Sequence, residues 1–453
     1  MEPFRFHLFV CTQGKPEGAP SCPASGSFQV LRILEAELLA QGLDPDVQVT
    51  TCGCLGLCDE GPILIVYPGP VYYRNVHPAD VREIVVSHLR DGQRVARLLW
   101  DDPAAIKAMS VEHRRRYRAM VDIRDRAGLL PDAINDVARA FMPARAILTA
   151  LELDLFTAIA NGASTVHLAN KLRTDARATE MLLNVLVSLN FLEKQKSTFY
   201  NTPASARFFV TGSPDNARPA LLHTANLWHT WSTLTDAVQA GTAVAHRART
   251  AEGVISFIAA MDRNAKERAA NVVKAVCSAN SGFRHMLDLG GGSAAYSIAF
   301  VRAHTELHSE ILDLPEVVPL TQEYVRKANL SDRISARAGD MLTAPLGENF
   351  DLILVSAICH MFSPAENRSL IQRAAQALAP GGLLVIQDFI LDSEKTAPAF
   401  AALFSLNMLV GTRSGASYSE PEYSTWLSEA YLTNIRHIPL PGPASLMLAQ
   451  RHS

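Results

Sequence analysis

The sequence predicts a multidomain α/β protein, and three observations support this fold class. First, 453 residues are enough for two to four domains of roughly 100–200 residues each. Second, strand-like and helix-like apolar patterns alternate near both ends of the chain, whereas the middle shows helical spacing. Third, five of the seven cysteines lie among the first 58 residues. We therefore predict domains at 1–100, 131–250 and 251–453, with a linker at 101–130.

Composition and charge argue against several kinds of partner. The formal net charge is −3 and no basic face dominates, so nucleic acid is not an expected partner. No apolar run approaches the roughly 20 residues that span a bilayer, so no membrane span is predicted. The N-terminus lacks the basic segment and apolar core of a signal peptide. We expect a cytoplasmic protein whose cysteines are reduced rather than paired in disulfides.

The first domain is predicted from alternating strand and helix patterns. Alternating apolar side chains predict a strand at 4–10, and a loop rich in glycine and proline leads from it to a helix at 27–42. A second strand at 47–50 completes a βαβ unit. The same patterns predict two further strands and a helix, at 63–67, 71–73 and 78–90.

Five cysteines follow the two strands of this βαβ unit. Cys11 and Cys22 follow the first strand, and Cys52, Cys54 and Cys58 follow the second. Because the unit brings both strand ends together, four thiolates can converge there, and soft thiolates are the ligands that iron and sulfide prefer. Intervening glycines let the backbone wrap a cluster. Zinc or plain burial explains a Cys-x3-Cys pair alone, but the upstream cysteines favour an iron–sulfur cluster.

Several motifs of this domain stand in an order known from one family. They are Cys11-Thr-Gln-Gly-Lys-Pro-Glu-Gly, Cys22-Pro-Ala-Ser-Gly-Ser, Cys54-Leu-Gly-Leu-Cys58-Asp-Glu-Gly-Pro and Pro78-Ala-Asp-Val-Arg-Glu-Ile-Val. The segment resembles the thioredoxin-like [2Fe-2S] ferredoxins. This resemblance implies a [2Fe-2S] cluster held by Cys11, Cys22, Cys54 and Cys58, and it implies a redox partner protein. Cys52 is then the spare thiol, and an exchange of Cys52 for Cys54 stays open.

The predicted linker at 101–130 is charged and polar and includes the run His113-Arg-Arg-Arg116. Such a run is usually the solvated face of a helix, and a docking patch for a partner is the alternative. We expect the solvated face.

The middle of the chain is predicted to be helical and to end in a short strand pair. The pattern predicts a last helix at 176–189 followed by a wing at 191–200. A winged-helix shape often binds DNA. This last helix is rich in leucine and poor in basic residues, however, so we do not expect it to read a DNA groove.

Four motifs suggest a different role for this helical domain. They are Ala150-Leu-Glu-Leu-Asp-Leu-Phe, Leu182-Leu-Asn-Val-Leu-Val-Ser-Leu, Phe199-Tyr-Asn-Thr-Pro and Leu227-Trp. In this order they resemble the winged-helix dimerisation domain of plant-like, hydroxyneurosporene and acetylserotonin O-methyltransferases. The resemblance implies an intertwined homodimer with the helix at 138–160 as its seam, although simple core burial gives the same pattern.

A glycine-rich turn near residue 290 predicts a cofactor site in the last domain. A strand that contains Asp288 ends in Gly290-Gly-Gly292, and a helix follows. Glycines let the backbone approach a ligand closely, and the start of the helix offers free amide groups. A turn of this kind alone also fits dinucleotides. For Asp288 the alternative to cofactor binding is that the carboxylate anchors the loop.

Acidic residues at the ends of the next strands narrow the cofactor class. Asp313 ends the second strand about 20 residues after the turn, where a carboxylate can hold both ribose hydroxyls. Asp340 and Met341 follow the third strand, placed to meet the adenine amino group and ring. No nicotinamide half with hydride-transfer residues follows. The order resembles class I S-adenosylmethionine methyltransferases and implies a Rossmann-like seven-stranded sheet with a terminal antiparallel hairpin.

His360 follows the fourth expected strand and is the candidate base. An imidazole near its intrinsic pKa can accept a phenol or enol proton, whereas a packing role is the alternative. The O-methyltransferase resemblance implies this role for His360, a histidine-orienting carboxylate at Glu420, and substrate contacts at Asn407 and Met408. Met361 stands where that family has an aspartate after the histidine. An amphipathic helix explains Asn407 and Met408 equally well.

Together these patterns predict a homodimeric S-adenosylmethionine-dependent O-methyltransferase with an attached [2Fe-2S] domain. The acceptor is expected to be a small aromatic or polyketide-like hydroxyl compound, and the attached domain to transfer electrons or regulate. One alternative is methylation of sulfur, nitrogen or carbon. The other is a redox-sensing protein that binds S-adenosylmethionine without turnover.

Overall fold

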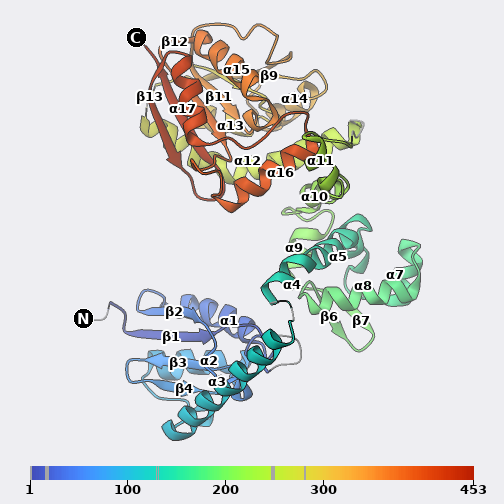
Figure 1. The fold of residues 1–453 in the computed structure, drawn as a ribbon, viewed down its shortest axis with the longest axis vertical. Helices are drawn as coiled ribbons and strands as arrows, with labels where there is room; N and C mark the ends of the chain where they lie inside the picture. The colour runs from blue at the N-terminus through green and yellow to red at the C-terminus, as the bar shows by residue number, and fades with distance from the viewer. Residues whose placement is uncertain are drawn as a thin grey trace. The chain divides into compact units, whose positions relative to one another are not determined.

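The computed structural model describes residues 3–15, 20–128, 130, 132–245, 250–279 and 282–452. The chain forms two compact units, Met1–Ala140 and Phe141–Ser453, called unit 1 and unit 2 below (Figure 1). The domain boundary that we predict at Pro131 lies outside the described residues. Across the described residues, no helix is both long and apolar enough to cross a membrane.

Unit 1 is built on a four-stranded sheet with the strand order β2-β1-β3-β4. The strands are β1 (Phe6–Cys11), β2 (Val47–Cys52), β3 (Leu64–Tyr67) and β4 (Val71–Tyr73). β1 and β2 are parallel, whereas β3 is antiparallel to β1 and β4 is antiparallel to β3. Cys11 lies opposite Cys52 in the β1–β2 register, so both strands deliver cysteines to the same edge of the sheet.

Helices close the core of unit 1 (Figure 1). α1 (Ser27–Ala40) buries Val30, Leu34 and Leu38, which are spaced four residues apart and therefore lie on one face. This face packs into the same core as Leu8 of β1. The other helical elements of unit 1, apart from α3, are η1 (Cys58–Glu60), η2 (Pro78–Asp80), α2 (Val81–Glu83), η3 (Ile84–Arg90), η4 (Ala96–Leu98) and α4 (Asp132–Arg139).

The segment for which the sequence predicts a linker is mostly a helix of unit 1, α3 (Pro103–Arg126). Ile106 packs against a buried cluster that contains two of the cysteines. The Ser110 hydroxyl donates a 3.0 Å hydrogen bond to the Leu55 carbonyl in the cysteine loop. One face of this polar helix therefore docks on the cysteine loop. Local polarity does not reveal that contact, because the partner lies 55 residues away in the chain.

The first part of unit 2 is helical and carries a three-stranded sheet with the order β5-β7-β6. Leu151, Phe156 and Phe199 lie in its core. Its helices are α5 (Phe141–Glu152), α6 (Leu155–Ile159), α7 (Thr165–Leu172), α8 (Ala176–Ser188), α9 (Pro203–Phe209), α10 (Arg218–Trp231) and α11 (Leu234–Ala240), and its strands are β5 (Ala163–Ser164), β6 (Leu192–Gln195) and β7 (Thr198–Asn201).

The second part of unit 2 is a seven-stranded sheet with the order β10-β9-β8-β11-β12-β14-β13. Strands β8 to β12 are parallel, and β14 is antiparallel to both β12 and β13. The strands are β8 (His285–Leu289), β9 (His308–Asp313), β10 (Ile334–Ala338), β11 (Phe350–Ser356), β12 (Leu378–Asp388), β13 (Leu432–Pro439) and β14 (Ser445–Arg451).

Helices cover both faces of this sheet, because successive strand residues point to opposite sides. On one face Val272 of α12 (Ala251–Ala279) packs in the same core as Leu352. On the other face Trp426 of α17 (Glu420–Glu429) packs in the same core as Ile353. The remaining helical elements are α13 (Ala295–Ala303), α14 (Val318–Lys327), η5 (Cys359–Met361), α15 (Pro364–Ala377) and α16 (Ala399–Gly411). The carboxyl ends of β8 to β12 meet at one edge, where parallel sheets usually bind ligands.

Candidate functional site

The glycine-rich turn after β8 is held against the end of β9. The Gly290 amide donates a 2.9 Å hydrogen bond to the Leu312 carbonyl, and the Gly292 amide donates a 2.8 Å bond to Asp313 Oδ2. Gly290 and Gly292 have φ angles of 71° and 55°, a backbone region that favours glycine. The sequence therefore needs glycine here for the backbone conformation, and Asp313 fixes the turn from the neighbouring strand.

The space above Gly290 is narrow and apolar. A Cβ atom at this position would lie 2.5 Å from Ile358 Cδ1 and 3.1 Å from Met341 Cε. Met341 is buried, whereas Asp340 is exposed and its carboxylate accepts a 2.9 Å hydrogen bond from the Leu342 amide. The structure thus brings Met341 to the glycine turn, while Asp340 lies at the outer rim of the same edge.

Asp288 lies beneath the turn and is fully buried. Ser297 donates a 2.7 Å hydrogen bond to Asp288 Oδ2, and a Cβ atom on Gly291 would lie 2.8 Å from the same oxygen. Burial raises the pKa of Asp288 to about 7, with the charge of Asp313 adding to the shift. These contacts fit the loop-anchoring alternative for Asp288.

His360 lies in η5, directly beside the end of β12. Its Nδ1 atom is 2.7 Å from Asp388 Oδ1, and its backbone amide donates a 3.2 Å hydrogen bond to Asp388 Oδ2. The two side chains are only 9% and 2% exposed. Because an ionised carboxylate only accepts hydrogen bonds, Nδ1 carries the proton and Nε2 keeps a free electron pair. This pairing leaves Nε2 as the ring nitrogen of His360 that can accept a proton.

Asp388, and not Glu420, is the carboxylate that orients His360 in this structure. Tyr423 donates a 3.2 Å hydrogen bond to Asp388 Oδ2 and so fixes the carboxylate further. Glu420 is half exposed and lies 3.2 Å from His437 Nδ1. The prediction for Glu420 is therefore corrected. Glu420 begins α17, where its carboxylate reaches β13, whereas Asp388 ends the strand that lies next to η5.

Two side chains and a glycine hold the His360 loop in place. Asn367 donates hydrogen bonds to the carbonyls of Cys359 and Phe362, at 2.9 and 3.2 Å. Tyr418 also donates to the Phe362 carbonyl. A Cβ atom on Gly415 would lie only 2.3 Å from the His360 carbonyl oxygen, so this position has room for glycine alone.

Three phenylalanine rings, called the phenylalanine wall below, pack next to the His360 imidazole: Phe389, Phe400 and Phe404. The Phe404 ring centroid is 4.8 Å away in an edge-on arrangement, and Phe389 lies 4.5 Å from Phe404. Phe400 continues the wall at 5.0 Å from Phe389, and the Arg268 guanidinium lies 5.4 Å from the Phe389 ring centroid. Aromatic rings pack favourably in such offset and edge-on geometries. The three phenylalanines therefore give one side of the His360 imidazole an apolar, aromatic environment.

The two predicted substrate residues lie on α16, beside this wall. The Trp231 indole donates a 2.8 Å hydrogen bond to Asn407 Oδ1, so Asn407 joins α16 to α10. Met408 is 8% exposed and belongs to the interior of the helix packing. Their contact with a substrate stays a prediction.

Comparisons with known proteins identify the family of this chain. An O-methyltransferase domain model matches residues 231–432, and an O-methyltransferase dimerisation domain model matches residues 135–212. A 3-hydroxy-5-methyl-1-naphthoate 3-O-methyltransferase from Streptomyces sahachiroi is 31% identical over 70% of this chain and 93% of the relative. The chain belongs to the O-methyltransferase family. The prediction of an S-adenosylmethionine-dependent O-methyltransferase enzyme is thereby confirmed.

Further relatives of this O-methyltransferase differ in the reactions they are named for. The tetracenomycin polyketide synthesis 8-O-methyl transferase of Streptomyces glaucescens is 30% identical over 71% of this chain and 97% of the relative. An N,N-dimethyltransferase of Streptomyces rimosus is 29% identical over 66% of this chain and 89% of the relative. Human N-acetylserotonin methyltransferase, solved with S-adenosylmethionine, shares the fold with a TM-score of 0.63 and 24% identity, covering 71% of this chain and 97% of that chain.

The cysteines of this O-methyltransferase form a second candidate site, in unit 1. The Cys54 and Cys58 sulfurs are 3.4 Å apart, and the Cys22 thiol is hydrogen-bonded to both Cys11 and Cys58. The hydrogen bond from Cys22 lowers the pKa of Cys11 to about 6, and it lowers the pKa of Cys58 to about 5 together with Lys15. The four predicted ligands of the O-methyltransferase's cysteine site therefore form one continuous group of thiols.

Cys52 stands outside this group. It lies in β2 opposite Cys11, and burial raises its pKa to about 11. Among the described residues, no thiol hydrogen bond to Cys52 accompanies those of the other four. The assignment of Cys54 to the ligand set and of Cys52 as the spare thiol of the O-methyltransferase stays a prediction.

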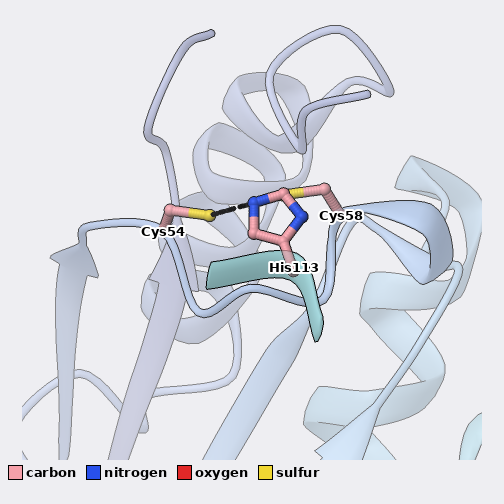
Figure 2. Close-up of side chains that lie close together, drawn as sticks. All are labelled: Cys54, Cys58 and His113. Atoms are coloured by element: carbon pink, nitrogen blue, oxygen red, sulfur yellow. Dashed lines mark hydrogen bonds between the residues drawn. The ribbon is translucent and has the colours of Figure 1, made fainter. Parts of the chain in front are cut away.

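His113 is a residue of this site that the sequence did not identify. Its Nε2 atom lies 3.8 Å from Cys54 Sγ, and the Lys15 ammonium lies 2.5 Å from the same nitrogen. Figure 2 shows the Cys54 and Cys58 sulfurs and the His113 ring turned toward one another. His113 follows Cys58 by 55 residues and begins an arginine run, so no ligand spacing marks it in the sequence.

Proposed function

We propose that this enzyme transfers a methyl group to a hydroxyl of a small aromatic or polyketide-like acceptor. The observation that carries the proposal is the buried His360–Asp388 pair beside the phenylalanine wall. A buried imidazole backed by a carboxylate can accept the proton of a phenol or enol. Relatives named for a naphthoate and for tetracenomycin polyketide synthesis support an acceptor of this class.

The residues around the glycine turn fit S-adenosylmethionine as the methyl donor. Asp313 already accepts backbone hydrogen bonds from Gly292 and Leu314, but a carboxylate has about four acceptor positions and can still bind ribose hydroxyls. The buried Met341 side chain offers an apolar surface for adenine, and Asp340 offers an acceptor for its amino group. When bound, the cofactor supplies the methyl group that the acceptor oxygen receives.

His360 supplies the proton chemistry of this proposal. As the methyl group reaches the acceptor oxygen, that oxygen gives its proton to His360 Nε2, and solvent takes the proton afterwards. Asp388 stabilises the resulting imidazolium through the 2.7 Å contact at Nδ1. The loop bonds from Asn367 and Tyr418 hold the imidazole in position. Positioning of reacting groups can lower a barrier by about 7–11 kcal/mol, so we assign most of the rate to it.

The variant His360→Gln tests this proposal. General base catalysis typically contributes about 10²–10⁴-fold, so transfer of labelled methyl groups should fall to a few per cent or less. Calorimetry should show unchanged affinity for S-adenosylmethionine, because His360 is not among the proposed cofactor contacts. Near-normal transfer by this variant would show that His360 is not the base.

Nitrogen methylation is the second candidate function. The sequence lacks the aspartate that usually follows the histidine in this family, and one relative is named an N,N-dimethyltransferase. A panel of phenols, aryl amines and thiols of matched ring size separates these candidates. We expect turnover of phenols, and preferential turnover of amines would reverse the assignment.

We also propose that unit 1 is a thioredoxin-like ferredoxin domain with a [2Fe-2S] cluster on Cys11, Cys22, Cys54 and Cys58. The parallel β1–β2 pair and the sheet order β2-β1-β3-β4 support this fold. The four thiols also form one hydrogen-bonded series, Cys11–Cys22–Cys58–Cys54, and a four-cysteine cluster needs four such convergent thiolates. When bound, the cluster would carry single electrons, either from a redox partner protein or as a regulatory signal.

Anaerobic purification tests the cluster. The reduced protein should give the absorption and paramagnetic-resonance spectra of a [2Fe-2S] centre, and Cys52→Ser should keep them. Serine at Cys11, Cys22, Cys54 or Cys58 should remove them. If Cys52→Ser loses the spectra and Cys54→Ser keeps them, Cys52 is the cluster ligand and Cys54 is the spare thiol.

We further propose that the enzyme is a homodimer that meets its partner copy through the helical part of unit 2. The dimerisation domain model over residues 135–212 supports this assembly. Large apolar side chains are also half exposed along this part, as expected for a surface that is covered in a dimer. They include Phe141, Met142, Met181 and Val185.

A further inference from the structure

The Lys15 ammonium is surrounded by three electron-pair donors. It lies 2.5 Å from His113 Nε2, and it also hydrogen-bonds to the sulfurs of Cys58 and Cys54. Two sulfurs and an imidazole nitrogen therefore lie beside one cationic group in this structure.

The three donor atoms lie close enough together to bind one metal ion. The Cys54 and Cys58 sulfurs are 3.4 Å apart, Cys54 Sγ and His113 Nε2 are 3.8 Å apart, and all three donor atoms lie within 4.8 Å of one another (Figure 2). A tetrahedral ion with bonds of about 2.3 Å to sulfur and about 2.0 Å to nitrogen separates its ligands by roughly 3.5–3.8 Å. The two pairs that include Cys54 have nearly this spacing, and Cys58 and His113 lie within 4.8 Å of each other.

The fold of unit 1 places His113 in this group. Ser110, one turn earlier on α3, donates a 3.0 Å hydrogen bond to the Leu55 carbonyl in the cysteine loop. Gly56 has a φ angle of 77°, and a Cβ atom there would lie 3.1 Å from Ser110. The loop and the helix therefore meet closely, and this contact holds the His113 ring over the two sulfurs.

We propose that Cys54, Cys58 and His113 bind a single tetrahedral transition-metal ion such as Zn²⁺, next to the Lys15 ammonium. Thiolate and imidazole are the ligand types that Zn²⁺ prefers. Among the residues that the structure describes, no fourth cysteine, histidine or carboxylate joins the group within the same distance. Water completes the coordination, so this ion keeps one open position.

This inference goes beyond the proposed [2Fe-2S] domain. It adds a histidine from α3, which lies outside the ferredoxin-like segment, and it uses neither Cys11 nor Cys22. The two metal sites share Cys54 and Cys58, so they exclude each other. A chain without the cluster is the form that takes the single ion.

Cobalt titration of the full-length, reduced, iron-free chain tests the site. Co²⁺ bound by thiolates and imidazole in a tetrahedral site gives visible d–d bands and a near-ultraviolet sulfur-to-cobalt charge-transfer band. His113→Ala should weaken Co²⁺ binding by more than about 10-fold, because even outer-shell partners of a metal typically contribute 10–100-fold. Lys15→Met should tighten binding, because it removes the competing cation.

Two control variants make the test specific. Arg114→Ala changes the exposed neighbour of His113 on α3 and should leave the titration unchanged. Cys11→Ser removes a proposed cluster ligand and should also keep the cobalt bands. If His113→Ala binds Co²⁺ as tightly and with the same spectrum as the unmodified chain, the proposal is overturned. Loss of the bands in Cys11→Ser would overturn it too, since the ion would then need the four-thiol site.

The two metal proposals fail separately. If anaerobically purified protein lacks the [2Fe-2S] spectra, only the cluster proposal is contradicted. The cobalt titration is done on iron-free chain, so its result bears only on the single-ion site. Histidine at position 113 can also be followed directly, because cobalt shifts its proton resonances strongly. An unshifted His113 resonance in the cobalt-bound chain would exclude it as a ligand even where a variant fails to fold.

Discussion

At the scale of single residues, two carboxylates with different partners show which of them can assist the proposed base, His360. Asp388 is buried and contacts His360, whereas Glu420 is half exposed and contacts His437. The sequence predicted His360, because a histidine after the fourth strand has a family precedent. It did not predict Asp388 as its partner, since the pairing joins residues 28 positions apart. The signal that could have identified this partner is the position of Asp388 at the end of a parallel strand, β12.

Asp388→Asn should lower the methyl-transfer rate by about 10²–10⁴-fold, because the amide no longer stabilises the imidazolium or fixes the Nδ1–H tautomer. Glu420→Gln is the matched control and should stay within about threefold of the unmodified enzyme, since rim contacts contribute little. Steady-state rates at saturating S-adenosylmethionine measure both. A large loss in Glu420→Gln with little loss in Asp388→Asn would restore Glu420 as the orienting residue.

Asp288 should make the fold less stable as the pH rises. Its pKa is about 7 in the folded chain and about 3.9 in an unfolded one, because burial disfavours the charged form. The folded state therefore binds more protons between these values. The stabilisation is complete below about pH 4 and is lost as the pH rises through 7. Asp288→Asn should flatten this slope in urea unfolding at pH 5 and pH 8, and an unchanged slope would contradict the assignment.

At the scale of elements, the carboxyl edge of the sheet was predictable and its loops were not. Periodicity located the parallel strands, and the glycine turn and Asp313 followed from their positions at strand ends. Asn190 lies just after α8, where the chain must reverse. Its φ angle is 61°, a left-handed conformation that asparagine tolerates. The sequence did not predict that helix α3 packs against the cysteine loop. Its contact with Leu55 depends on how the chain folds and not on the local residue pattern.

Gly415→Ala should impair catalysis through the loop rather than through the cofactor. The added methyl group would lie 2.3 Å from the His360 carbonyl, so η5 must shift. Overpacking of this kind typically costs about 1–3 kcal/mol of stability. Gly411→Ala is the matched control, because nothing lies within 4 Å of its added carbon. In Gly415→Ala the methyl-transfer rate should fall while the affinity for S-adenosylmethionine stays unchanged. Equal methyl-transfer rates of both variants would show that the loop tolerates the shift.

At the scale of the whole molecule, the proposed dimer gives the apolar surface of the helical part a function. Met142 is 54% exposed on α5, within the helix that the sequence predicts as the seam. Met142→Glu should shift sedimentation from dimer toward monomer, because a carboxylate is costly to bury without a partner. Tyr431→Glu alters an 85% exposed residue beside β13 and should leave the dimer intact. If the unmodified chain sediments as a monomer, the homodimer proposal is wrong.

The order of the strands in the chain separates the two sites in time during synthesis. The sheet of unit 1 is complete at Tyr73, whereas Asp388 lies in β12, which receives its antiparallel neighbour only when Ser445 pairs with Asp388. Ribosomes add roughly 5–20 residues per second, so these events are on the order of tens of seconds apart. The cysteines of the two proposed metal sites are therefore synthesised well before the chain can complete the proposed acceptor site at His360 and Asp388. Under the two metal proposals, iron or zinc supply during translation would decide which metal state the finished enzyme inherits.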